Sequence, residues 1–273
     1  HRLVFGHPRV TGQQQIKVIV QPGREHRLRR FLLEGGFPEA QGLEDRDRFA
    51  LLRSYVDVVV LRDVIERHEV SNPTALRWMQ HQLLGSPAGL FSVQKLYNLL
   101  KGQGIQASKD TLHAYLSHFE DAFLVSTVSV HAGSARRRMV NPRKAYPVDQ
   151  GLIPLYERMG QSNLGHALET AVYHELRRRG YEVDYVLTAS GHEVDFLAFA
   201  SGQAELLIQV SLDVRGPETF DREVCALHEA GVEYPRAERL LITLESTPPG
   251  ELPAGTAWKP AADWLLGEQG DAV

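Results

Sequence analysis

The chain has 273 residues, of which 43% are hydrophobic and 23% charged, with a formal net charge of −4. This length can bury one large core or two ordinary ones, so we expect two domains, and the single cysteine excludes a disulfide framework and favours a reducing, cytoplasmic setting. No apolar run reaches the roughly 18 residues of a membrane span, and the N-terminus lacks a signal-peptide layout, so we expect no membrane partner.

Residues 1–42 form a poorly periodic segment. The stretch "VIVQPG" at 18–23 predicts a strand and a turn, and the basic run "REHRLRR" follows at 24–30. We expect this segment to be a linker from, or a remnant of, an upstream ATPase module.

A long helix is predicted next. No glycine or proline interrupts the sequence from Leu43 to Glu69, and its apolar residues recur at helical spacing. The β-branched residues of this stretch do not remove that periodicity. Asn72 and Pro73 then predict the start of a further helix.

Residues 91–147 carry the pattern of a winged helix-turn-helix. A helix closed by glycines at 102 and 104 is followed by a second helix that begins at a Ser108 cap, and two strands then flank a basic loop. We therefore expect a helical and winged-helix domain over 43–150. In a DNA-bound module the second helix faces the major groove and the loop faces phosphates. The candidates are Lys109, His113 and Ser117 on the helix, and Arg136, Arg137, Arg138, Arg143 and Lys144 in the loop.

The charge is distributed unevenly along the chain. Residues 1–150 hold 21 Lys+Arg against 14 Asp+Glu, whereas residues 151–273 hold 9 against 20. A basic first half suits nucleic acid, and an acidic second half can hold a cation. Winged helices also serve as protein-docking modules, so both DNA and a protein partner remain open.

Residues 151–273 alternate helix and strand. Their predicted order is αβββαβ, which is that of a restriction-endonuclease-like core. The fold class is therefore α+β to α/β, with a helical and winged-helix N-terminal half before this core. The predicted elements are a helix from 162 to 180, strands at 181–186, 192–200 and 205–211, a helix at 217–231 and a strand at 238–245.

Two neighbouring strands carry the candidate site. Because side chains alternate along a strand, Glu193 and Asp195 share one face of their strand, and Gln209 and Ser211 share one face of the next. Glu169, at the margin of the apolar stripe of the preceding helix, can reach over the sheet edge. Carboxylates gathered in this way can hold Mg²⁺, although a strand-end pair bonded to backbone or to an arginine is the structural alternative.

Four pieces of sequence together resemble the C-terminal region of a large prokaryotic family of AAA+ ATPases, in which an uncharacterised domain follows the nucleotide-binding module. The pieces are "GGFPEA", "YVDVVVLRDV", "FEDAFLVSTVSV" leading to "KAYPVDQGL", and "LETAVYHELRRRG" leading to "EVDF" and "IQVS", within residues 31–245. The sequence contains no GxxxxGK[ST] loop, so we expect ATP binding only through an upstream module.

In that family the C-terminal part resembles the PD-(D/E)XK nuclease fold. The resemblance places Asp195 on the strand aspartate, Glu169 on the helical glutamate, Gln209 at the (D/E) position and Ser211 at the lysine position. Cleavage by such a site needs carboxylates that hold Mg²⁺ and a lysine beside them. Gln209 can still offer a carbonyl oxygen, but Ser211 cannot replace an ammonium. We expect a degenerate site with weak Mg²⁺ binding at Glu169 and Asp195.

A substitute cation would have to come from elsewhere. No lysine lies between Lys144 and Lys259, which leaves Arg222 as the candidate, although arginine is a poor general base. Three functions remain open: a non-catalytic DNA-recognition or regulatory portion of an AAA+ type ATPase, a Mg²⁺-dependent DNA nuclease, and a protein-docking scaffold.

Other reactive side chains give weaker patterns. The histidines at 166, 174 and 192 form no HExxH signature, so core or surface roles are expected for them rather than metal binding. Cys225 lies within a predicted helix and is expected to be an inert thiol. Glu175 falls within an apolar stripe and is expected to pair with a neighbouring arginine.

Overall fold

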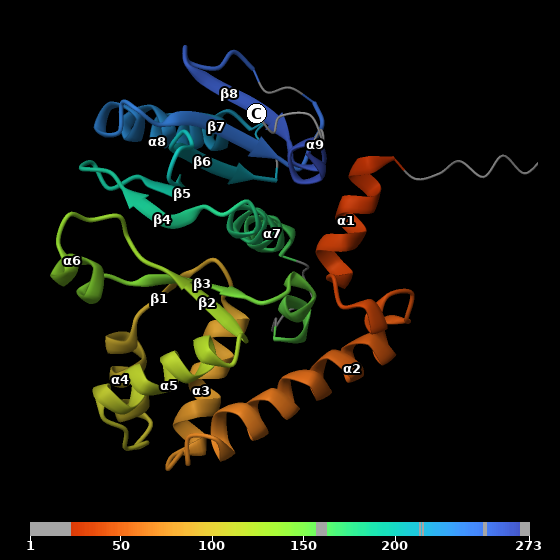
Figure 1. Cartoon of the computed structure of the whole chain (residues 1–273), viewed down its shortest axis with the longest axis vertical. Coiled ribbons are helices and arrows are strands. Elements are labelled where there is room, and N and C mark those ends of the chain that lie inside the picture. The colour runs from red at the N-terminus through yellow and green to blue at the C-terminus, as the bar shows by residue number, and fades with distance from the viewer. Residues whose placement is uncertain (1–22, 157–162, 213, 215, 248–249, 268–273) are drawn as a thin grey trace, which may run out of the picture.

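The protein is a mixed α/β structure in which a five-stranded sheet and a three-stranded sheet are surrounded by helices (Figure 1). The computed structural model describes residues 23–156, 163–212, 214, 216–247 and 250–267. None of the helices in these ranges combines the length and the apolar composition that a bilayer crossing requires.

The described part of the chain begins with helices that run along one side of the molecule (Figure 1). These elements are α1 (Arg24–Glu34), the 3-10 turn η1 (Pro38–Ala40), α2 (Asp45–Val58) and η2 (Val59–Glu66), a π-helical continuation of α2. The predicted long helix is therefore present. The strand predicted within residues 18–21 lies outside the described residues, and α1 was not predicted.

Three further helices begin at polar caps. The side chains of Asn72, Ser92 and Ser108 each accept a backbone N–H of the first helical turn, which satisfies an otherwise unpaired donor. The cap predicted at Ser108 is thus confirmed. The elements of this part are α3 (Pro73–Gly85), β1 (Leu90–Phe91), α4 (Val93–Gly102) and α5 (Lys109–Asp121).

The basic stretch after α5 differs from the predicted loop between two strands. Between β2 (Val125–Val128) and β3 (Arg143–Pro147) the chain forms the short helix α6 (Ala135–Val140). The Ser134 hydroxyl accepts the Arg137 backbone N–H at 3.3 Å and caps this helix. The three strands form an antiparallel sheet of order β1-β3-β2.

The second half contains the larger sheet, of order β4-β5-β6-β7-β8, in which β4, β5 and β6 are antiparallel and β6, β7 and β8 are parallel. The predicted αβββαβ order is present, whereas β8 and α9 were not predicted. The elements are η3 (Gln150–Leu155), α7 (Leu164–Arg178), β4 (Glu182–Leu187), β5 (Glu193–Phe199), β6 (Leu206–Ser211), α8 (Pro217–Glu233), β7 (Glu238–Thr243), β8 (Thr256–Pro260) and α9 (Ala261–Leu266).

The large sheet is buried on both faces. Phe196 and Ile208 belong to the apolar cluster that includes α7, while their neighbours Leu197 and Leu207 belong to the cluster that includes α8. This alternation follows from the two-residue period of a strand. It places the α7 and α8 side chains at opposite faces of the strands that carry the candidate site.

Strand β3 lies between the two halves of the molecule (Figure 1). Ala145 packs into the apolar cluster that includes α2, α3, α4 and α5, while Tyr146 packs into the cluster that includes α7 and the large sheet. The segment after β2 also joins β4, because the backbone of Tyr185 bonds to Ser129 and His131 at 3.0 and 2.7 Å. One face of β3, which carries Lys144 and Tyr146, therefore points toward the carboxylates of the second half.

The "GGFPEA" stretch forms a tight junction between α1 and η3. Gly35 has a φ of 82°, and a Cβ built on it would lie 2.0 Å from Asp149 Oδ1 and 2.8 Å from the Gly151 Cα. Asp149 holds the junction by accepting the backbone N–H groups of Gly36 and Gly151, each at 2.7 Å. Gly35 is needed here both for its backbone conformation and for its lack of a side chain.

We predict that Gly35→Ala lowers the free energy of unfolding by more than the strain of placing an alanine at a positive φ would explain. Gly42→Ala is a matched control, since Gly42 has a φ of 75° but a Cβ added to it would meet no atom within 4 Å. The control should cost about 1 kcal/mol, and Gly35→Ala should cost about 3 kcal/mol or more because strain and overpacking add. Urea unfolding of both variants measures the difference, and equal losses would contradict the close packing at Gly35.

Candidate functional site

The centre of the candidate site is the ammonium of Lys144, which enters from β3. Its Nζ lies 2.9 Å from Glu169 Oε1 of α7, 2.7 Å from Glu193 Oε1 and 2.8 Å from Asp195 Oδ1, the last two on β5. The ammonium donates hydrogen bonds to Glu169 and Asp195, and the Glu193 carboxylate lies beside it as a third, ion-paired partner. Lys144 is only 1% exposed.

Tyr146, two residues after Lys144 on the same face of β3, completes the contact with α7. Its hydroxyl donates to Glu169 Oε1 at 2.8 Å, and its ring stacks on Tyr173 with centroids 4.5 Å apart. Glu169 Oε1 therefore accepts from both Lys144 and Tyr146. These contacts fix the position of the Glu169 side chain, which is itself buried.

A second set of contacts orients Asp195 from β6 and α8. Its Oδ2 accepts the Val210 backbone N–H at 2.9 Å, and its own N–H donates to Gln209 Oε1 at 3.3 Å. The Gln209 amide donates in turn to Glu223 Oε2 on α8 at 2.5 Å. The carbonyl oxygen of Gln209 thus faces the Asp195 backbone.

The electrostatics of the cluster follow from its burial. Burial alone lowers the pKa of Lys144, but the charges of Asp195 and Glu169 outweigh it and hold that pKa well above its usual value. Burial, together with the charge of Asp195, raises the pKa of Glu169 to about 7 against the opposing effect of Lys144. One ammonium thus faces three acids, and Glu169 is held closer to its neutral form than an ordinary glutamate.

Mg²⁺ prefers carboxylate and carbonyl oxygens at 2.0 to 2.1 Å, and Glu169, Glu193 and Asp195 are ligands of that type. The oxygens converge, however, on the Lys144 nitrogen, which occupies the centre that a cation would take. A metal ion does not fit this site unless Lys144 leaves it. The arrangement therefore supplies the countercharge of the carboxylates from within the chain.

The structure brings together Glu169, Asp195 and Gln209 as the sequence predicted. Ser211, at the end of β6 and half-buried, lies two residues beyond Gln209. The guanidinium of Arg222 is exposed and pairs with Glu223 Oε1 at 2.5 Å, so the cation among the carboxylates is a different residue.

One prediction about Lys144 is wrong. We expected it to contact DNA phosphates, but its ammonium is buried among three carboxylates of the second half. Sequence reasoning searched for a lysine near the motif strands and so missed one that lies 51 residues before Asp195. It also missed Tyr146 and Glu223, both of which contact motif residues.

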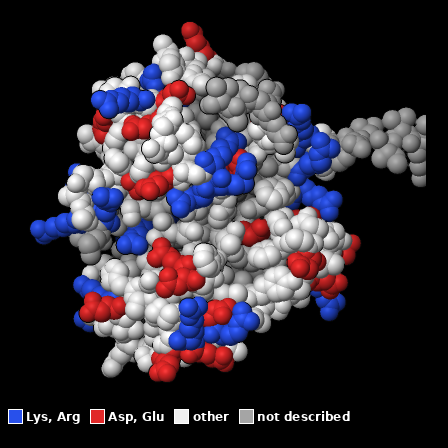
Figure 2. Space-filling model, in the orientation of Figure 1, with Lys and Arg blue, Asp and Glu red and all other residues white. Residues whose placement is uncertain are grey.

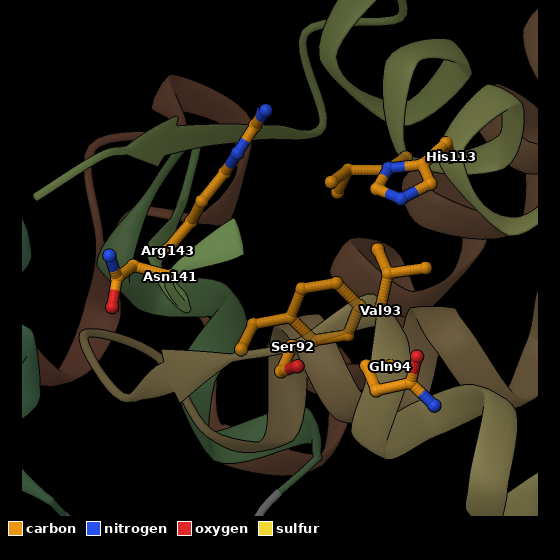
Figure 3. A pocket seen from close by; sticks show the side chains of 8 residues that line it. Ser92, Val93, Gln94, His113, Asn141 and Arg143 are labelled. Carbon is orange, nitrogen blue, oxygen red and sulfur yellow. The ribbon is translucent and has the colours of Figure 1, made fainter. Parts of the chain in front are cut away.

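Two of the remaining DNA candidates meet at a cleft. His113 of α5 and Arg143 of β3 lie on opposite sides of a cavity of about 340 Å³ (Figure 3). Ser92, Gln94 and Asn141 add polar groups to the same lining. The Arg143 guanidinium is held by a 3.3 Å hydrogen bond to a threonine hydroxyl of β2. The cleft thus combines one cation with several hydrogen-bonding groups.

The other candidates are spread over the surface. Lys109, Ser117 and the three arginines of α6 are exposed. The Lys109 ammonium lies 5.4 Å from the centre of the Tyr97 ring, which is a cation–π distance. Basic and acidic side chains are interspersed on the face shown in Figure 2, so this face carries no uniformly basic surface.

The weaker patterns are resolved in part. Glu175 pairs with Arg178 and Arg179, each at 2.6 Å, as predicted. The ring of His174 contacts the Pro147 carbonyl oxygen at 2.7 Å, which is a structural role. His192, by contrast, lies next to Cys225 and Glu229.

A family model described as "Domain of unknown function (DUF8612)" matches residues 25–162, which is half of the chain. The chain belongs to this family. The matched segment contains α1 through η3 and includes Lys144, but it ends before the carboxylates of α7 and β5. The family domain therefore supplies the ammonium, and the rest of the chain supplies the acids.

Two curated relatives are longer proteins. "Uncharacterized protein MJ1544" of Methanocaldococcus jannaschii is 32% identical over 155 residues, which are 56% of this chain and 34% of the relative. An "Uncharacterized protein" of Haemophilus influenzae is 28% identical over 150 residues, which are 55% of this chain and 38% of the relative. The chain spans little more than a third of each relative. No solved structure matches it significantly.

The raised pKa of Glu169 predicts a pH dependence of stability. Between its ordinary pKa of 4.5 and about 7, the folded chain keeps a proton on Glu169 that the unfolded chain has released. The contribution of this group to stability is therefore present at low pH and lost as pH rises through that window, by on the order of 2 to 3 kcal/mol.

Glu169→Gln, which copies the neutral acid, should flatten this part of the dependence. Urea unfolding at pH 5, 6, 7 and 8 compares it with the parent chain and with Glu175→Gln. The latter is a control on the same helix, where burial opposes but Arg178 and Arg179 lower the pKa. Identical pH slopes for the parent and Glu169→Gln would rule out a titrating Glu169.

Proposed function

We propose that the chain is the non-catalytic DNA-recognition or regulatory C-terminal portion of an AAA+ type ATPase. In this proposal residues 43–150 form a helical and winged-helix domain, and the second half is a nuclease-like fold that has lost its reaction. The observation that carries the proposal is the buried Lys144 ammonium among Glu169, Glu193 and Asp195.

The chemistry of phosphodiester cleavage argues against an active site here. Such a site must expose its carboxylates to a metal ion and to the substrate phosphate. Glu169 and Asp195 are 9% and 7% exposed, and Lys144 is 1% exposed. A lysine that orients water must also be open to solvent, whereas the Lys144 ammonium bonds to two carboxylates and has a third 2.7 Å away. The site therefore suits a structural junction between the two halves.

The DNA-recognition part of the proposal rests on the first half. It has a net charge of +7. The α4-turn-α5 order, the antiparallel sheet and the cleft between His113 and Arg143 suit a module that reads nucleic acid with a helix and a basic strand. Arg136, Arg137 and Arg138 on α6 remain free to contact phosphates, since all three are exposed.

The link to an ATPase rests on the sequence resemblance and on the length of the relatives. The aligned segments cover 34% and 38% of the two curated relatives, which leaves room in those proteins for a separate nucleotide-binding module. A regulatory portion would then act by coupling DNA contact in the winged helix to that module.

Our first functional prediction concerns the metal. Lys144→Ala should leave three carboxylates around an empty centre, so Mg²⁺ or Mn²⁺ should raise its thermal unfolding midpoint, with stabilisation of about 2.7 kcal/mol at a hundredfold excess over Kd. The parent chain should show no Mg²⁺-dependent shift. Lys144→Ala combined with Asp195→Ala should lose the response, because a ligand is removed, and Lys101→Ala controls for loss of a lysine.

The matching cleavage assay incubates the parent chain with supercoiled plasmid and branched DNA in Mg²⁺ or Mn²⁺. We expect no nicking. Robust cleavage by the parent that disappears in Asp195→Ala would overturn the non-catalytic proposal and make Lys144 the lysine of a working nuclease. The cleavage assay needs no Lys144 variant, so it still tests the proposal if Lys144→Ala fails to fold.

A second functional prediction concerns DNA. Changing Arg136, Arg137 and Arg138 together to Ala should weaken duplex binding and flatten its salt dependence by about 0.9 log units per lost phosphate contact. Binding is measured by fluorescence anisotropy across a salt series. The matched control removes the same charge elsewhere, from the exposed Arg46, Arg67 and Arg77. No binding by the parent, or equal losses in both variants, would favour the protein-docking scaffold.

A further inference from the structure

A second group of ligand-type side chains lies on the solvent side of α8. Cys225 and Glu229 are one helical turn apart, and His192 comes from the turn that precedes β5. Ligand atoms of the three residues all lie within 4.8 Å of one another. The His192 Nδ1 is 2.8 Å from Glu229 Oε2, and the Cys225 Sγ is 3.8 Å from Glu229 Oε1.

The β4–β5 turn holds this group in place. The Thr188 hydroxyl accepts the His192 backbone N–H at 3.0 Å and donates to Glu229 Oε2 at 3.1 Å. The Ser190 hydroxyl also contacts Glu229 Oε2. The Ala189 N–H donates to the Glu233 carboxylate at 2.9 Å, which ties the turn to the end of α8. His192 and the α8 ligands therefore come from two elements with a fixed relation.

The ligand types point to one class of ion. Imidazole, thiolate and carboxylate together form a set typical of zinc, whereas Mg²⁺ and Ca²⁺ prefer oxygen ligands alone. The surroundings include further acids, since Glu233 bonds to the same turn and Asp221 acts electrostatically on Cys225. That charge favours a divalent cation at this surface.

We propose that His192, Cys225 and Glu229 form a binding site for a divalent transition-metal ion of the zinc class, with a fourth position open to water. Around tetrahedral zinc the ligand atoms are about 3.3 to 3.8 Å apart, so small side-chain rotations close the observed set onto an ion. Cys225 releases its thiol proton to solvent as it binds. His192 binds through Nδ1, so the proton that Nδ1 donates to Glu229 goes to solvent, and the neutral ring then carries its one proton on Nε2.

This site does not depend on the proposed function. It shares no ligand with the Lys144 cluster, and a bound ion would join the β4–β5 turn to α8 whether or not the chain contacts DNA. Its exposure also makes it a reversible site, because the open position and the three exposed or half-buried ligands allow exchange with solvent.

The decisive property is that the sequence contains a single cysteine. Titration of the full chain with Co²⁺ chloride should therefore give a thiolate-to-cobalt charge-transfer band that reports Cys225 alone, saturating at one ion per chain. Added Zn²⁺ should displace the cobalt and abolish the band. Zn²⁺ should also protect Cys225 from alkylation by iodoacetamide.

Cys225→Ser should abolish the band, and His192→Ala or Glu229→Gln should weaken Zn²⁺ affinity by at least about tenfold to a hundredfold. His228→Gln, which removes an exposed histidine of the same helix, should leave both readouts unchanged. Three results would overturn the proposal. Cobalt could bind without a charge-transfer band, the band could be unaffected by His192→Ala and Glu229→Gln, or the titration could saturate at half an ion per chain. Circular dichroism of each variant checks that the fold is retained.

Discussion

The burial of one ammonium among three carboxylates constrains the rest of the structure. Moving Lys144 and its partners out of water is costly, and the intact set adds little net stability, yet removing one partner from such a buried pair typically costs about 3 to 5 kcal/mol. The Lys144 cluster therefore acts mainly by disfavouring other packings of the two halves. It requires β3, a strand of the first half, to lie within reach of α7 and β5 of the second half.

The same constraint explains why the second half gathers Glu169, Glu193 and Asp195 without an open metal site. A cation of the chain itself lies among these carboxylates. That cation is the Lys144 ammonium of the first half, not an ion from solvent. The DUF8612 segment, which contains Lys144, and the acidic second half are thus complementary in charge at their junction.

Much of the fold could be predicted because its elements have strong local signals. The apolar period from Leu43 to Glu69, the Ser108 cap and the alternation in β5 each agree with the structure. Helix α1 was missed because its stability comes from Leu28 and Leu32 packing against distant elements, not from its own basic sequence. The helix α6 was missed because an arginine run gives no apolar period.

The site could be predicted only where its residues are close in sequence. Asp195 and Gln209 face each other across one hairpin, so strand alternation was sufficient. Lys144 was read as part of a basic loop, although its neighbour Tyr146, on the same face of the strand, signals that this face is buried. A lysine on the buried face of a strand needs a partner of opposite charge. No local sequence rule, however, identifies Asp195, which lies 51 residues after Lys144.

The placement of β3 between two cores also affects how the chain is made. Lys144 leaves the ribosome 51 residues before Asp195, an interval of about 3 to 10 s at ordinary rates of synthesis. Until β5 emerges, the face of β3 that carries Lys144 and Tyr146 must stay solvated or be covered by something other than its final partners. The first half can thus form its helices early, but its central strand is completed only when the second half arrives.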